Sequence, residues 1–228
     1  MKVPAIIFSR MGSSRLPGKA LRHIAGEPLI KRVIDRVSKV KNLSTIVVAT
    51  SNSKTDDRLT QYIQSLNIEV FRGATHDVLN RAVSCASYLG VDKFVRINGD
   101  SPLIDPELLE KGIEMWTDPS LDLISNVFPR TYPVGMSVEI IKTDSLKKIM
   151  GLTADSCDSE HVTRFFYKNP EKFRILNFES GRSELREVRL AVDTEEDLER
   201  IDWLFKEFGG LINFEMAAEK SSLWSSVE

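Results

Sequence analysis

The chain has 228 residues, of which 42% are hydrophobic, so it can bury the core of one large domain. Its 31 basic and 33 acidic residues leave a formal charge of −2, which argues against a general nucleic-acid or membrane-surface binder. Its two cysteines lie outside any metal-binding or disulfide pattern, and no apolar run resembles a membrane span or signal sequence. We therefore expect a cytoplasmic protein without a zinc site.

Short β-branched runs alternate with helical patterns in the first half of the chain. Each predicted strand is apolar throughout, which is typical of a parallel sheet covered by helices on both faces. Asp105, followed by Pro106, marks the start of a further helix. The predicted strands cover residues 3–8, 45–50, 68–71 and 93–97, and the predicted helices between them cover 29–40, 57–66 and 78–89.

The second half of the chain is less regular, because its apolar runs are shorter and are interrupted by prolines. The pattern still predicts further strands and one helix before the C-terminal region. The predicted strands cover 121–127, 137–142, 173–178 and 188–192, and the predicted helix lies around 158–168.

The last clear helix begins after Thr194, because "TEED" is a capping box whose third residue after the cap is Asp197. Gly209 and Gly210 end it. No repeat or linker divides the chain, so we predict a single domain with a Rossmann-like fold. This α/β fold is an open, mostly parallel sheet with helices on both faces, and its second half adds a small sheet or dimerisation element. The predicted parts are a nucleotide-binding half (1–105), an acceptor and dimerisation half (106–208) and a tail (209–228).

A cationic, hydroxyl-rich loop, "SRMGSSRLPGK", follows the first predicted strand. In an open parallel sheet, ligands bind at the carboxyl ends of the strands. Backbone N–H groups, serine hydroxyls and the cations Arg10, Arg15 and Lys19 together suit a polyphosphate. The loop is not a Walker A motif, since Ala20 follows the lysine, and it is not GxGxxG. A solvated basic loop is the alternative interpretation.

Two aspartates follow predicted strands that are far apart in the sequence. Asp100 lies in "NGDSPL" after the strand at 93–97, and Asp193 follows the run at 188–192. Two carboxylates from separate loops, completed by substrate oxygens, form the usual Mg²⁺ arrangement. We therefore predict that Asp100 and Asp193 hold Mg²⁺. Taken singly, Asp100 could be a turn residue and Asp193 could only favour a helix N-terminus.

Five segments in order, "RMGSSRLPGKAL", "NGDSPLI", "GMSVEII", "EHVTRFFYKNP" and "LAVDTEEDLE", resemble the cytidylyltransferase family. This family includes the synthetases of CMP-activated 3-deoxy-octulosonate and CMP-sialic acid, and the resemblance is strong to the branch called spore coat polysaccharide biosynthesis protein F. It implies a fold of the nucleotide-diphospho-sugar transferase type and a homodimer. It also implies that the enzyme moves CMP from CTP to an acidic sugar and releases pyrophosphate, for cell-surface polysaccharide synthesis.

The resemblance also implies roles for particular residues. Arg10 and Lys19 would bind the triphosphate, while Asp100 and Asp193 would hold Mg²⁺. Further nucleotide-binding positions are Met11, Gly12, Ser13, Ser14, Arg15, Arg72 and Asn98, and the acceptor-binding candidates are Met136, Glu139, Glu160 and His161.

Some assignments and functions stay open at this point. Glu160 and His161 could equally form a helix cap or a dimer contact, and no spacing singles out Arg130 or Arg164 as the cation for an acceptor carboxylate. The alternative functions are a nucleotidyltransferase with a phosphorylated or phosphonate acceptor or another nucleotide, and a non-catalytic nucleotide-binding subunit. A glycosyltransferase is disfavoured, because no D-x-D motif occurs at Asp100.

Overall fold

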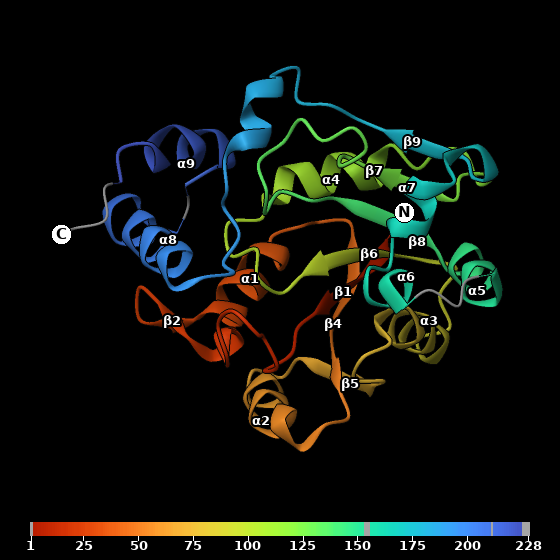
Figure 1. Cartoon of the computed structure of the whole chain (residues 1–228), viewed down its shortest axis with the longest axis horizontal. Helices are drawn as coiled ribbons and strands as arrows, with labels where there is room; N and C mark the ends of the chain where they lie inside the picture. Colours follow the sequence, from red (N-terminus) through yellow and green to blue (C-terminus); the bar gives the residue numbers. More distant parts are fainter. Residues whose placement is uncertain (1, 153–155, 211, 225–228) are drawn as a thin grey trace.

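The computed structural model describes residues 2–152, 156–210 and 212–224, and within them seven strands form one open sheet (Figure 1). The four strands of the first half run parallel, as the continuous apolar runs predicted. The second-half strand that pairs with these parallel strands is β8, and it is antiparallel to both of its neighbours, β6 and β7. The order across the sheet is β5 (Glu69–Gly73), β4 (Leu43–Ser51), β1 (Val3–Phe8), β6 (Lys93–Asn98), β8 (Glu139–Lys142), β7 (Leu123–Ser125) and β9 (Ile175–Asn177).

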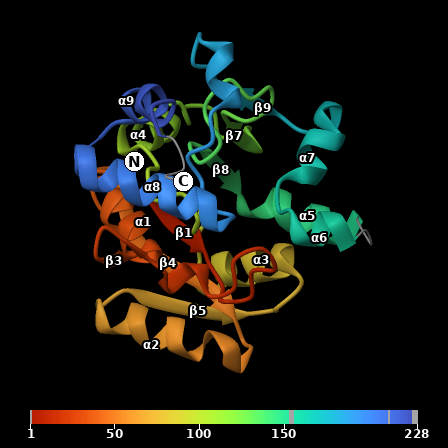
Figure 2. The same cartoon turned by 60° about the vertical axis from the view of Figure 1, so that its left-hand side comes forward.

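Helices cover both faces of the sheet, and each face has its own hydrophobic core (Figure 2). Ile6 and Ile7 of β1 are both fully buried but belong to opposite cores, which explains why the strand is apolar throughout. No helix in the described ranges has the length and apolarity to cross a membrane. One core contains side chains from α1 (Leu29–Val37), α2 (Asp57–Ser65), α4 (Pro106–Glu114), α8 (Glu195–Phe208) and α9 (Phe214–Ser221), and the other contains α3 (Val78–Tyr88), α5 (Thr143–Leu152) and α7 (Arg164–Lys168).

The second half differs from the prediction in several places. Its strands extend the central sheet and do not form a separate small sheet; the described two-stranded sheet, β2 (His23–Ile24) with β3 (Glu27–Pro28), lies in the first half. The predicted helix around 158–168 is divided into α6 (Ser156–Glu160) and α7 by a turn in which Arg164 N donates to His161 O. Helix α5 was not predicted.

The predicted strand at 188–192 is wrong, although the segment has one backbone bridge, between Val134 and Arg189. Leu190 N donates to Val134 O, whereas Val192 N donates to Asp100 O. Because the segment changes its partner within two residues, it cannot form a regular ladder. It instead links the loop before β8 to the loop after β6, and so brings Asp193 close to Asp100.

Gly135 should be sensitive to substitution, because it combines a φ of +106° with close contact to the 188–192 segment. A Cβ atom there would lie 2.7 Å from Leu190 C and 2.8 Å from Ala191 N. We expect Gly135→Ala to lower the free energy of unfolding by about 3 kcal/mol, from strain and overpacking combined. Urea denaturation measures this loss.

Gly181 provides a matched control, because its φ is +75° and nothing lies within 4 Å of its Cβ position. Gly181→Ala should therefore cost only about 1 kcal/mol, from backbone strain. Equal losses for the two variants would show that the contact with Leu190 contributes nothing.

Candidate active site

The loop after β1 curls around the backbone of Met11. Ser13 N and Gly18 N both donate to Met11 O, at 3.0 and 2.9 Å, and Gly18 has the positive φ (+72°) that closes this turn. The Leu16 side chain is buried and anchors the loop to the core. The loop is therefore held in one shape, and from it the partly exposed side chain of Arg15 reaches Asp193, with 3.1 Å between the guanidinium and Oδ2.

Asp56, in the segment after β4, holds this loop in place through a hydrogen bond from Met11. Its Oδ1 accepts a hydrogen bond from Met11 N at 2.7 Å, and its Oδ2 accepts from Thr50 Oγ1 at 2.9 Å and from both Ser51 N and Ser51 Oγ. Asp56 is 1% exposed, so these donors replace water. Burial alone would raise the pKa of the carboxyl, but the hydrogen bonds from Ser51, Met11 and Thr50 lower it below 3.8.

Asp56→Asn should destabilise the protein at neutral pH by about 2 kcal/mol, because an amide cannot accept all four hydrogen bonds. The pKa of Asp56 is depressed in the folded state, so its stabilisation is present above pH 3.8 and lost as the pH falls through the folded-state pKa. Urea denaturation across the acidic range should show a flatter pH dependence for the variant. Asp35→Asn, which changes an exposed carboxylate paired with Lys31, is the control. An unchanged pH profile for Asp56→Asn would contradict the assignment.

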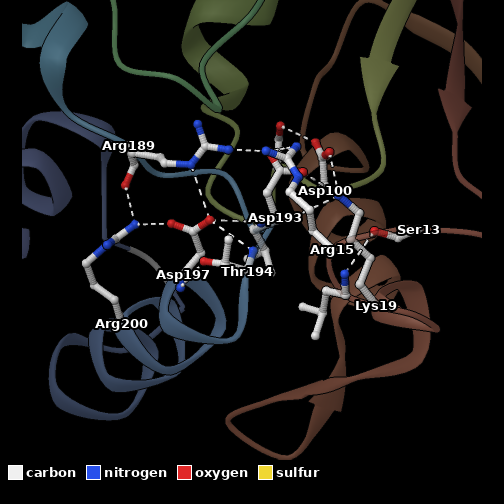
Figure 3. A network of polar contacts seen from close by, with 12 residues as sticks. Ser13, Arg15, Lys19, Asp100, Arg189, Asp193, Thr194, Asp197 and Arg200 are labelled. Atoms are coloured by element: carbon white, nitrogen blue, oxygen red, sulfur yellow. Dashed lines mark hydrogen bonds and ion pairs between the residues drawn. The ribbon is translucent and has the colours of Figure 1, made fainter. Parts of the chain in front are cut away.

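Asp100 and Asp193 lie on either side of the Lys19 ammonium group (Figure 3). Lys19 Nζ is 2.9 Å from Asp100 Oδ2, 2.9 Å from Asp193 Oδ1 and 2.9 Å from Val192 O. Burial alone would raise the pKa of Asp193, but the hydrogen bond and charge of Lys19, with Arg15 and Arg189, lower it. Asp193 is therefore ionised at neutral pH.

Arg189 and Asp197 hold Asp193 in position through its carboxylate and its backbone N–H (Figure 3). Arg189 contacts the carboxylates of both Asp193 and Asp197. Asp197 Oδ2 also accepts from Asp193 N at 3.0 Å and from Thr194 N at 3.1 Å, which completes the predicted capping box of α8. The same residues that begin the helix therefore hold Asp193 in place.

Gly99 brings the end of β6 against the end of β1. A Cβ atom at this position would lie 2.6 Å from Ser9 Cβ and 2.8 Å from Phe8 O, so only glycine fits without movement. Gly99 N donates to Phe8 O at 2.9 Å. The close approach places Asp100 beside the loop after β1.

These segments enclose a cavity of about 320 Å³ at the carboxyl end of β1 and β6. Polar and charged groups dominate its wall, as expected for a site that binds a charged ligand. Ten predicted site residues line it: Arg10, Gly12, Ser13, Ser14, Arg15, Lys19, Asp100, Glu160, His161 and Asp193.

A family model described as cytidylyltransferase matches residues 4–221, which include the whole of this cavity. The chain belongs to the cytidylyltransferase family. Its fold agrees with that assignment, because the chain superposes on the structure of a cytidylyltransferase from Leptospira borgpetersenii with a TM-score of 0.91 and 28% identity. That superposition covers 98% of this chain and 94% of the other.

Two curated relatives extend the comparison. The spore coat polysaccharide biosynthesis protein SpsF of Bacillus subtilis is 33% identical over 210 residues, or 90% of this chain and 86% of the relative. The 3-deoxy-manno-octulosonate cytidylyltransferase of Geobacter sulfurreducens is 36% identical over 115 residues, which are 50% of this chain and 44% of the relative. The second similarity therefore covers only half of this chain.

Several predicted residues of this cytidylyltransferase lie outside the cavity wall. Met11 packs against the core, and Asn98 ends β6 without lining the cavity. Arg72 instead joins β5 to the end of β4 and the start of α2, since it donates to Ser51 O at 3.0 Å and to Asp57 Oδ1 at 2.7 Å.

Met136 and Glu139, which the sequence assigned to the acceptor, do not line the cavity. Met136 is fully buried in a hydrophobic core, and Glu139 is only 2% exposed. Glu139 contacts Arg96, which itself lines the cavity. The acceptor roles of Met136 and Glu139 stay predictions.

Sequence reasoning missed two arginines in the cavity wall, Arg81 and Arg96. Arg81 is 2% exposed, and burial lowers its pKa, with the nearby charge of Arg10 acting in the same direction. Arg96 interrupts the apolar run of β6, and a charge inside a buried strand was the one available signal. Arg81 gave no comparable signal, because it lies in an ordinary amphipathic helical pattern.

Proposed function

We propose that this cytidylyltransferase moves CMP from CTP to a hydroxyl of an acidic sugar of the ulosonic acid type, releasing pyrophosphate, for cell-surface polysaccharide synthesis. One observation carries the proposal. The cationic loop, the Asp100–Lys19–Asp193 cluster and the polar pair Glu160 and His161 line a single cavity. Groups suited to a polyphosphate and groups suited to a polar acceptor are therefore found in one cavity.

The loop after β1 supplies positive charge and hydroxyl donors for the triphosphate. In the transfer, the acceptor oxygen bonds to the α-phosphorus as the bond from that phosphorus to the pyrophosphate oxygen breaks, and the hydroxyl proton is lost. The protein contributes mainly by holding the two oxygens in line and by stabilising charge on the phosphate. Arg10, Arg15 and Lys19 are the residues we assign to that stabilisation.

Mg²⁺ fits the same cluster. Asp100 Oδ2, Asp193 Oδ1 and Val192 O converge on the Lys19 ammonium, and such oxygens suit a hard cation. No group of three acidic, histidine or cysteine side chains that could hold a metal occurs in the described part of the chain, so phosphate oxygens would complete the coordination. Bound Mg²⁺ would neutralise phosphate charge and lower the pKa of the attacking hydroxyl. We assign Asp100 and Asp193 as its ligands.

The names of the relatives support the acceptor class. One is a cytidylyltransferase for 3-deoxy-manno-octulosonate, and another acts in spore coat polysaccharide biosynthesis. Further relatives are named as cytidylyltransferases for 8-amino-3,8-dideoxy-manno-octulosonate. An eight- or nine-carbon sugar acid is therefore the acceptor class that we propose for this chain. The homodimer and the cytoplasmic location stay predictions.

A pyrophosphate-release screen tests the proposal. CTP, ATP and GTP would each be combined with Mg²⁺ and with a panel of ulosonic acids and phosphorylated sugars, and products would be identified by mass spectrometry. We expect release with CTP and a sugar acid, and almost none with ATP or GTP. Release with every nucleotide, or with none of the acids, would contradict the proposed function.

Two alternatives have their own signatures in this screen. Four arginines, Arg10, Arg15, Arg81 and Arg96, line the cavity, so a phosphorylated or phosphonate acceptor is the second candidate. It would be identified by a product that carries the extra phosphorus. A non-catalytic nucleotide-binding subunit would bind CTP tightly in calorimetry and turn over no acceptor.

A further inference from the structure

A row of buried polar side chains crosses from β7 and α7 through β8 to the cavity wall. Arg96 on β6 and Glu139 on β8 are direct partners in the antiparallel register, and their side chains form an ion pair. Tyr167 OH donates to Glu139 Oε1 at 2.6 Å and lies 2.8 Å from Ser125 Oγ. Arg96 is the member of this row that lines the cavity.

This row fixes the orientation of the Arg96 guanidinium. Burial alone would raise the pKa of Glu139, but the charge of Arg96 and the hydrogen bond from Tyr167 lower it, so the pair is ionised. Both oxygens of Glu139 are occupied, one by Arg96 and one by Tyr167. The Phe8 ring centroid lies 6.0 Å from the guanidinium carbon and limits movement of the group.

The remaining donors of Arg96 are unused. Only one amino nitrogen contacts Glu139, and neither Nε nor the other amino nitrogen donates to any residue in the described ranges. The Nε atom is buried, and the whole side chain is 16% exposed. Buried donors without an acceptor are rare in folded proteins, so the free donors of Arg96 are candidates for binding a ligand. A guanidinium edge in a partly desolvated wall is the group that best matches a carboxylate.

The other cations of the wall are less suited to this task. Arg10 donates to Thr75 O at 3.1 Å and lies 3.6 Å from Glu160. Arg81 also has a buried Nε without a partner, but one of its amino nitrogens donates to Ala74 O at 2.6 Å. Both are near the loop that we assign to the triphosphate. Arg96 lies on β6, on the β8 side of the sheet and away from β4 and β5.

Arg130, one of the two cations that the sequence offered for the acceptor carboxylate, lies outside the cavity wall. It donates to Pro133 O at 3.4 Å and Ser137 Oγ at 3.1 Å and does not line the cavity. Arg164, the other cation, lies 3.7 Å from Asp158 and does not line the cavity either, so the candidates for binding the acceptor carboxylate are the cations of the cavity wall.

We infer that Arg96 binds the carboxylate of the acceptor sugar, and that Glu139 and Tyr167 are positioning residues that hold Arg96. This assignment rests on the proposed function, because it names the group that would recognise the acid in an acidic sugar. It gives the enzyme a means to choose an acid over a neutral sugar of the same shape. It also explains why Glu139, which does not line the cavity, is charged although it is buried.

A comparison of two acceptors that match in shape and differ in charge tests the assignment. The kinetic constants of the wild-type protein and of Arg96→Met would be measured with an accepted ulosonic acid and with the primary amide of that acid. We expect the wild type to prefer the acid, and Arg96→Met to raise KM for the acid about 10- to 100-fold while KM for CTP stays unchanged. The preference for acid over amide should disappear in the variant.

Two further variants separate recognition from folding. Arg96→Lys keeps the charge and should restore part of the preference for the acid, so the test survives if Arg96→Met does not fold. Tyr167→Phe should raise KM for the acid several-fold, leave KM for CTP unchanged and weaken the preference. Arg32→Met, which removes a part-buried arginine bonded to Ile24 O and Ala25 O away from the cavity, is the control.

The outcomes distinguish this inference from the proposed function. If the wild type transfers CMP to no carboxylated sugar, both are overturned. If it does so and Arg96→Met still prefers the acid to the amide, only the role of Arg96 is overturned. Equal increases in KM for CTP and for the acid would likewise show that Arg96 is merely structural.

Discussion

Replacing Asp100 by alanine is expected to lower kcat about 1000-fold while CTP binding stays measurable. Asp100 lies 2.9 Å from Lys19 Nζ and is one of the two carboxylates that we assign to Mg²⁺. The loop after β1, which we assign to the triphosphate, keeps its anchors at Met11 and Leu16 in this variant. Pyrophosphate release measures the first effect, and calorimetry with CTP measures the second.

The expected loss should come from chemistry and not from unfolding. The Asp100 side chain is 29% exposed, and its bonds to other side chains are those from Lys19 and Ser101, so its removal leaves no large cavity. We therefore expect the Tm to change by only a few degrees. Asp144→Ala, at the exposed start of α5, is the control and should retain full activity. An undiminished rate for Asp100→Ala would exclude the metal assignment.

The sequence was sufficient to predict the part of the site that lies in the loops after parallel strands. Parallel strands end at a common edge, so a cationic loop after β1 and an aspartate after β6 had to be neighbours once the apolar runs were recognised as parallel strands. Asp193 was also located correctly, although the predicted strand before it is absent. Its position depends on the short capping box of α8, which is a local signal.

The rest of the site depends on register and burial, which one sequence does not reveal. Arg96 and Glu139 are 43 residues apart and meet only because β8 is antiparallel to β6. Asp56 precedes a helix and resembles a cap, yet its carboxylate folds back onto Met11. Met136 was assigned to the acceptor from a motif, but the motif says nothing about which side of the backbone faces the core.

Replacing Lys19 by methionine is expected to change two binding constants in opposite directions. The Lys19 ammonium lies where three oxygens converge, so a divalent cation has to displace it. Without that ammonium, Asp100 and Asp193 lose a partner that neutralises them, and a divalent cation should bind about 10-fold more tightly in the absence of nucleotide. CTP binding should weaken, and kcat should fall about 100-fold, because a donor to the phosphates is lost. Calorimetry with Mg²⁺ alone, with CTP alone and with both measures the two affinities.

The opposite signs make this prediction specific to the proposed displacement. A general loosening of the site would weaken both Mg²⁺ and CTP, and Lys206→Met, which removes an exposed lysine paired with Asp202 on α8, should change neither. Lys19→Arg keeps the charge and should not gain affinity for Mg²⁺. The double variant Lys19→Met with Asp100→Ala should lose the gain, because a cation held between two carboxylates needs both. If Lys19→Met binds Mg²⁺ no more tightly than the wild type, the lysine and the metal do not share a position. Lys19 would then act on the triphosphate alone.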